Sequence, residues 1–117
     1  MLASGAPKDL QIPAGNTFGI GTPQGTVTVN NFYKNIVASE DEFLVLASMT
    51  QYQITYDTTR SSFYMELGVQ TDRAAAEQAL LAMLGVKQAD ICKLDIREHW
   101  PGSPTTANSL PKLSFCP

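Results

Sequence analysis

The feature that most restricts the fold is a pair of alternating segments followed directly by a helical stripe. Residues 52–57 alternate apolar and polar side chains, and residues 63–69 do the same after the polar link 58–61. A period of two places alternate side chains on opposite faces of a strand, so the two segments predict a β-hairpin. The link contains neither glycine nor an Asn-Gly pair, which favours a four-residue loop over a tight turn.

The segment 72–84 predicts the main helix. Its apolar residues recur at spacings of three and four and form one stripe: Ala75, Ala76, Ala79, Leu80, Met83 and Leu84. Thr71 or Asp72 is expected to cap the first turn through its side-chain oxygen. Gly85 suits the left-handed conformation that often follows a helix, and a one-turn helix is expected over 88–92.

Shorter patterns predict strands on both sides of this unit, at 26–29, 43–46, 94–97 and 113–116. Strands before and after one helix indicate the α+β class. We therefore expect an antiparallel sheet of about four to five strands with one main helix packed on one face. The 117 residues have the length of one domain, which we assign to 26–117.

Residues 1–25 are rich in glycine and proline and predict a flexible or extended N-terminal arm that could act as a linker. Phe18 and Ile20 alternate around Gly19 and could add a short edge strand. The glycines of 15–25 superficially resemble a phosphate-binding loop, but the Gly-Lys-Ser/Thr ending of such a loop is missing.

The two cysteines, Cys92 and Cys116, are compatible with a disulfide that ties the end of the chain to the segment after the helix. The spacing fits neither a zinc site, which needs four ligands, nor a Cys-x-x-Cys redox motif. The alternative is a pair of unrelated buried thiols in a cytosolic protein. A disulfide would indicate an oxidising compartment and therefore export.

Charge and hydropathy exclude several classes of partner. The net charge is −3, and basic residues such as Arg60, Arg73, Lys87, Lys93 and Arg97 are scattered singly, which argues against binding nucleic acid or an anionic membrane. No apolar run reaches the length of a membrane span, so we expect no insertion of this segment. The first residues lack the features of a signal peptide, so the chain is either cytosolic or has lost an export segment.

Side chains that could carry chemistry are few. His99 is the single histidine and would share a strand face with Asp95 and Arg97, which makes a general base conceivable there. A solvent-facing histidine at a strand end is the simpler interpretation. The acidic run 40–42 could offer oxygen ligands to a cation, but its spacing favours a solvated turn. We predict no catalytic residues, no metal site and no cofactor.

Three aromatic residues fall outside the strongest inward registers: Tyr33, Tyr64 and Trp100. Exposed aromatic side chains often dominate binding interfaces, so the three form a candidate interaction surface. The alternative for Tyr64 is that it packs beneath the N-terminal arm.

Residues 73–86 and 89–94, together with the closing Ser-Phe-Cys-Pro, resemble small exported bacterial proteins of uncharacterised activity that follow a tethered N-terminal segment. In that group a Tyr-x-Ile-x-Tyr strand, a Phe-x-x-x-Leu strand and an Ala-Glu-Gln-Ala-Leu-Leu-x-x-Leu-Gly helix precede a cysteine. The similarity covers roughly 26–117. It implies export and a Cys92–Cys116 pair, and it implies no activity.

These patterns lead to one functional expectation and one alternative. We expect a non-enzymatic exported or cell-envelope domain, located in the periplasm, at the cell surface or outside the cell. It would bind a protein partner or itself, tethered or exchanging a strand through its N-terminal arm. The alternative is a small-ligand or enzymatic site at the strand end around Asp95, His99 and Trp100.

Overall fold

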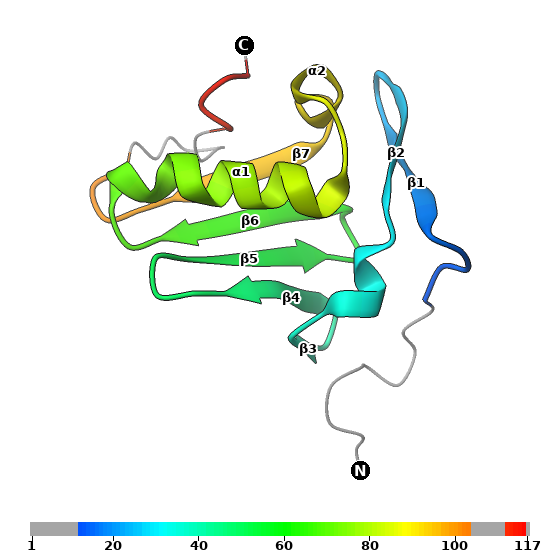
Figure 1. Ribbon diagram of the computed structural model, residues 1–117, viewed down its shortest axis with the longest axis horizontal. Helices are drawn as coiled ribbons and strands as arrows, with labels where there is room; N and C mark the ends of the chain where they lie inside the picture. The colour runs from blue at the N-terminus through cyan, green and yellow to red at the C-terminus, as the bar shows by residue number, and fades with distance from the viewer. Residues whose placement is uncertain (1–11, 104–111, 117) are drawn as a thin grey trace.

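The computed structural model describes residues 12–103 and 112–116 and has the α+β fold expected from the sequence. A five-stranded sheet carries one main helix on one face, and a separate two-stranded hairpin stands beside it (Figure 1). In chain order the elements are β1 (Thr17–Thr22), β2 (Gly25–Asn30), η1 (Phe32–Asn35), β3 (Ala38–Glu40), β4 (Phe43–Ser48), β5 (Tyr52–Asp57), β6 (Ser62–Leu67), η2 (Gln70–Asp72), α1 (Arg73–Leu84), α2 (Gln88–Ile91) and β7 (Asp95–His99).

The strands of the main sheet lie in the order β3-β4-β5-β6-β7. The first four are antiparallel neighbours, and β5 and β6 form the predicted hairpin with the loop 58–61. In contrast to the antiparallel expectation, β7 runs parallel to β6, so the sheet is mixed. The helices α1 and α2 carry the chain back to the end of the sheet where β6 began, and such a crossover requires parallel pairing.

The main helix ends as the sequence predicts but is not capped as predicted. Gly85 follows Leu84 with φ 65°, the left-handed conformation expected there. Asp72 makes no capping bond to the first turn of α1, and its carboxylate accepts the Val69 N–H at 3.3 Å instead. Asp72 already has helical backbone angles at the end of η2, so its side chain lies over the preceding turn. The short helix α2 confirms the one-turn helix.

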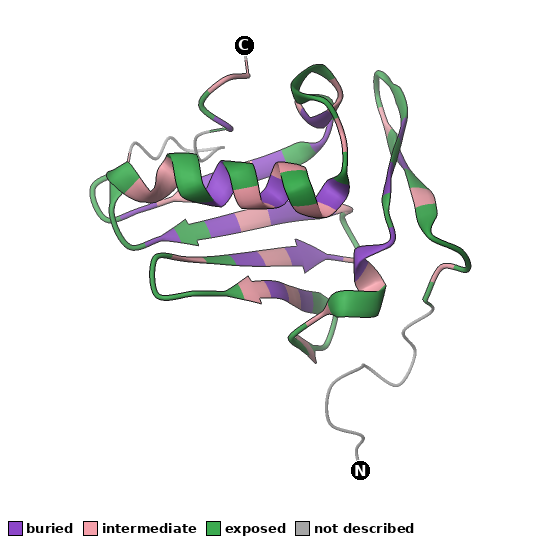
Figure 2. Ribbon diagram, viewed as in Figure 1, coloured by how far each residue is buried: buried purple, intermediate pink, exposed green. Residues whose placement is uncertain are grey.

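The core lies between α1 and the near face of the sheet. Ala76, Leu80 and Leu84 of α1 are fully buried in one cluster with Phe63 and Met65 of β6. Figure 2 shows these buried positions alternating along the central strands with more exposed ones. The small Ala76 side chain lets the helix approach the sheet closely.

Residues 17–25, expected to belong to an extended arm, form most of a folded hairpin. β1 pairs with β2 along its whole length, and Ile20 is buried in the core. Phe18 packs its ring 5.3 Å from that of Phe32, between ring centroids. The two apolar side chains of β1 thus outweigh the glycines around them, and Gly25 adopts the positive φ of 116° after the turn. Residues 1–11 of the predicted arm lie outside the described residues.

The C-terminal segment 112–116 is a turn and not the predicted strand. The Cys116 N–H donates to the Leu113 carbonyl at 3.1 Å, and Leu113 is buried. Cys92 and Cys116 form a disulfide with their Cα atoms 5.5 Å apart, which confirms the predicted pairing. The covalent bond and the burial of Leu113 hold the segment without a strand ladder.

Candidate functional site

A pocket of about 400 Å³ lies where four separate parts of the chain meet. Its walls are the turn between β1 and β2, the loop between β5 and β6, the segment from the end of α2 into β7, and the C-terminal segment with the disulfide. Because these parts are distant in sequence, only the tertiary fold brings the walls of the pocket together. We refer to it below as the basic pocket.

The basic pocket concentrates positive charge. Four of the eight basic side chains of the protein line it, against a single acidic side chain, Asp95: these are Arg60, Lys93, Arg97 and Lys112. The chain as a whole carries a net charge of −3. A cavity lined by one sign of charge attracts ligands of the opposite sign.

The one acidic side chain among the described residues of the pocket already has hydrogen-bond partners. Asp95 accepts a hydrogen bond from the Ser62 hydroxyl at 2.5 Å and one from Arg97 Nε at 3.1 Å. Lys93 pairs with Asp90 at 3.3 Å on an exposed surface, where such a pair is weak. Within the described residues, the charged groups of Arg60 and Lys112 have no carboxylate partner. The pocket therefore keeps positive charge that its own walls do not neutralise.

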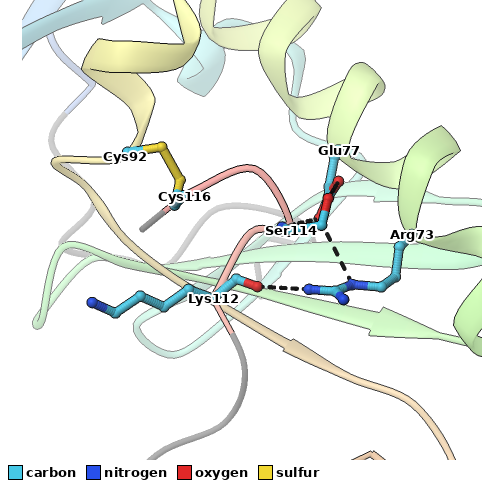
Figure 3. The surroundings of a disulfide bond; sticks show 6 residues. All are labelled: Arg73, Glu77, Cys92, Lys112, Ser114 and Cys116. Carbon is cyan, nitrogen blue, oxygen red and sulfur yellow. Dashed lines mark hydrogen bonds and ion pairs between the residues drawn. A yellow bond between two sulfur atoms is a disulfide. The ribbon is translucent and has the colours of Figure 1, made fainter.

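The C-terminal wall is braced from inside the molecule (Figure 3). Arg73 Nη2 donates to the Lys112 carbonyl at 2.8 Å, and the Lys112 side chain extends away from Arg73. The Glu77 carboxylate accepts the Ser114 N–H at 2.7 Å and the Ser114 hydroxyl at 2.6 Å. Together with the Cys92–Cys116 bond, these contacts fix the position of Lys112 at the pocket.

A buried carboxyl pair lies behind this wall. Glu98 is fully buried, and its Oε1 accepts a hydrogen bond from Arg73 Nε at 2.7 Å. The guanidinium carbon of Arg73 lies 4.7 Å from the centre of the Trp100 ring. Burial, reinforced by the neighbouring Glu77, raises the pKa of Glu98 to about 8. Burial alone would raise the pKa of Glu77 as well. Hydrogen bonds from Glu98 and Ser114 have the larger combined effect, so the pKa of Glu77 is lowered from its ordinary value. With this pKa, Glu98 holds its proton at neutral pH, next to ionised Glu77.

The three aromatic residues of the candidate interaction surface do not lie together. Tyr33 is half-buried and packs against Phe18 and Tyr56, near the β1–β2 hairpin. Tyr64 is half-buried on the opposite face of the sheet, since its neighbours in β6 face the core. Trp100 is only 6% exposed, because Arg73 covers its ring. The expectation of an exposed Trp100 is therefore wrong.

The residues of the alternative site are also separated. Asp95 lines the basic pocket, but His99 lies at the other end of β7 with Nδ1 2.5 Å from the Glu66 carboxylate. Trp100 belongs to the core. The acidic run 40–42 forms the β3–β4 turn, as expected. In the part of the chain that the structure describes, no group of three His, Cys, Asp or Glu side chains is placed to hold a metal ion.

The basic pocket was missed by sequence reasoning, which treated its basic residues as scattered. Lys93 follows Cys92 directly and Lys112 lies four residues before Cys116, so the disulfide implies that these two lysines are close. Arg60 has no comparable signal, because only the pairing of β6 with β7 brings its loop to the same place.

Across 12–103 and 112–116, no helix is both long and apolar enough to cross a membrane. The chain matches no protein family, and no curated protein or solved structure is significantly similar to it. The function is therefore argued from the geometry of the basic pocket.

Proposed function

We propose that this chain is a non-enzymatic, extracytoplasmic domain that binds an acidic segment of a protein partner in the basic pocket. The observation that carries the proposal is the gathering of half of the basic side chains around one pocket of an otherwise acidic protein. Arg60 and Lys112 supply charge that no carboxylate of the described residues neutralises. Arginine and lysine in such a setting favour carboxylate ligands.

The nature of the pocket favours binding over catalysis. Among the described residues that line the pocket, Asp95 is the only one with a carboxylate side chain. It is already held by Ser62 and Arg97, so it is poorly placed to act as a general base. His99 points to a different neighbour, Glu66, at the far end of β7. The pocket offers charge and shape to a ligand and no arranged proton acceptor.

An acidic peptide fits better than a nucleic acid. Outside the pocket the chain carries ten acidic residues against four basic ones, which disfavours a long polyphosphate chain, and nucleic-acid binding requires many phosphate contacts. A short run of Asp and Glu needs only the local positive charge of the pocket. The partner is therefore proposed to present a short acidic segment.

The disulfide supports an extracytoplasmic location. Structural disulfides persist in the periplasm, at the cell surface and outside the cell, whereas cytosolic thiols are kept reduced. Cys92 and Cys116 both line the basic pocket, so an oxidising compartment would also preserve the binding site. In this proposal the segment before β1 serves as the tether, and strand exchange is not required because β1 pairs with β2 in the same chain.

The test is the binding of a fluorescent oligo-glutamate peptide, measured by anisotropy at low salt. We expect binding that weakens as salt screens the charges, and that is lost in the double variant Arg60→Ala/Lys112→Ala. The matched control, Lys34→Ala/Lys87→Ala, removes the same charge at exposed positions outside the pocket and should bind normally. Equal loss in both double variants would mean that net charge, and not the pocket, drives the binding.

A further inference from the structure

We infer that the partner of the basic pocket is a second copy of this chain, and that the segment it receives is the acidic turn Glu40–Asp41–Glu42. This inference rests on the proposed function, because it names the occupant of the same pocket. The acidic turn connects β3 to β4, and all three of its side chains are exposed.

The acidic turn presents its charge in a defined shape. The Glu42 carbonyl accepts bonds from both the N–H and the hydroxyl of Thr58, each at 2.9 Å, which ties the turn to the neighbouring loop. Asp41 has a φ of 54°, the left-handed conformation of a tight hairpin turn. A ligand segment that is already ordered loses little conformational entropy when it binds.

The charges of the turn and the pocket are complementary. Among the described residues, Glu40, Asp41 and Glu42 form no ion pair with any basic side chain. In the part of the chain that the structure describes, two basic side chains of the pocket, Arg60 and Lys112, have no carboxylate partner. The other two, Lys93 and Arg97, pair with Asp90 and Asp95. The turn carries negative charge and the pocket carries positive charge, and this complementarity favours their association.

The acidic turn does not occupy the pocket of its own molecule. It is tied through Thr58 to the loop that carries Arg60, but among the described residues no ion pair joins the turn to the pocket, and the pocket lining does not include it. The wall formed by β7 is three strand spacings away from β4, about 14 Å in total. The inferred contact is therefore between two molecules. Since the two surfaces are different, each copy can bind one neighbour through its turn and another through its pocket, which produces rings or open chains.

Sedimentation velocity of the full chain at low salt tests this arrangement. We expect the wild-type protein to form larger species as its concentration rises, and high salt to dissociate them. A turn variant, Glu40→Gln/Asp41→Asn/Glu42→Gln, keeps the fold because asparagine tolerates the left-handed conformation. The turn variant and the pocket variant Arg60→Ala/Lys112→Ala should each be monomeric alone, with self-association weakened by about tenfold or more.

The mixture of the two variants gives the sharpest result. The turn variant keeps an intact pocket and the pocket variant keeps an intact turn, so an equimolar mixture should stop at one-to-one dimers. Controls Glu66→Gln and Lys34→Ala/Lys87→Ala, which change exposed charges elsewhere, should assemble like wild type. Assembly that survives in the turn variant would overturn the inference. So would a wild-type protein that stays monomeric at every concentration while still binding oligo-glutamate, a result that leaves the proposed function standing. If the wild-type protein neither self-associates nor binds oligo-glutamate, the pocket is not a binding site for acidic segments.

Discussion

At the scale of single residues, the most consequential group is the buried pair of Glu77 and Glu98 behind the C-terminal wall. Two carboxyl groups in contact cannot both be ionised cheaply in the protein interior. Arg73 supplies one positive charge to the pair, so a single proton on Glu98 leaves the cluster neutral overall. Ionised Glu77 is then free to accept both hydrogen bonds from Ser114.

The raised pKa of Glu98 makes stability depend on pH. The folded chain holds this proton up to a pKa of about 8, whereas the unfolded chain releases it near the ordinary value of 4.5. Between these values the folded state binds more protons, so the free energy of unfolding falls as pH rises. We expect a loss on the order of a few kcal/mol between about pH 5 and pH 8 from this group.

Replacing Glu98 with glutamine tests this directly. Glu98→Gln keeps the size and polarity of the side chain but removes its titration, so the fall in stability across this pH range should largely disappear. The measurement is urea unfolding at several pH values, with Glu66→Gln as the control because Glu66 is exposed. A variant with the same pH profile as wild type would show that Glu98 is ionised in the folded protein.

At the scale of elements, the end of α1 is joined to the N-terminal hairpin through Gly85. The Asn30 side chain of β2 donates to the Met83 carbonyl at 3.2 Å and lies where a side chain at position 85 would go. A Cβ atom added to Gly85 would come within 2.5 Å of Asn30 Nδ2. Gly85 is therefore required for two reasons: its backbone is left-handed, and Asn30 of the hairpin lies too close to leave room for a side chain.

A pair of glycine substitutions separates these two demands. Gly85→Ala should cost the strain of a positive φ and also displace Asn30, whereas Gly102→Ala, at φ 85° with open space around it, should cost only the strain. We expect about 1 kcal/mol for Gly102→Ala and roughly twice that or more for Gly85→Ala, measured by chemical denaturation. Equal costs would mean that the hairpin does not press on the end of the helix.

Local sequence patterns predicted the elements better than their arrangement. The β5–β6 hairpin and α1 were predicted because each depends on periodicity within one segment, and the disulfide was predicted because the chain has two cysteines, one of them next to its last residue. The direction of β7 was not predicted, because Leu94 and Ile96 lie on one face of the strand whether it runs parallel or antiparallel to its neighbour. Trp100 was misplaced because its burial depends on Arg73, 27 residues away in sequence.

At the scale of the whole molecule, charge is distributed unevenly. Half of the basic residues line the pocket, while the acidic turn lies at the β3 edge of the sheet, next to the β5–β6 loop that carries Arg60. The cysteine positions could have indicated that Lys93 and Lys112 are close, but the β6–β7 pairing that brings Arg60 to the same place has no signal in the sequence. The candidate site is thus a property of the tertiary fold.

The central claim is that this molecule recognises acidic segments at one defined place. An NMR titration of isotopically labelled protein with oligo-glutamate peptide tests it most directly. The account predicts that the shifted backbone amides cluster in 21–24, 60–61, 92–97 and 112–116, and that the shifts fade as salt is added. Shifts spread evenly over the surface, or centred on the face of the sheet that carries Tyr64, would contradict it.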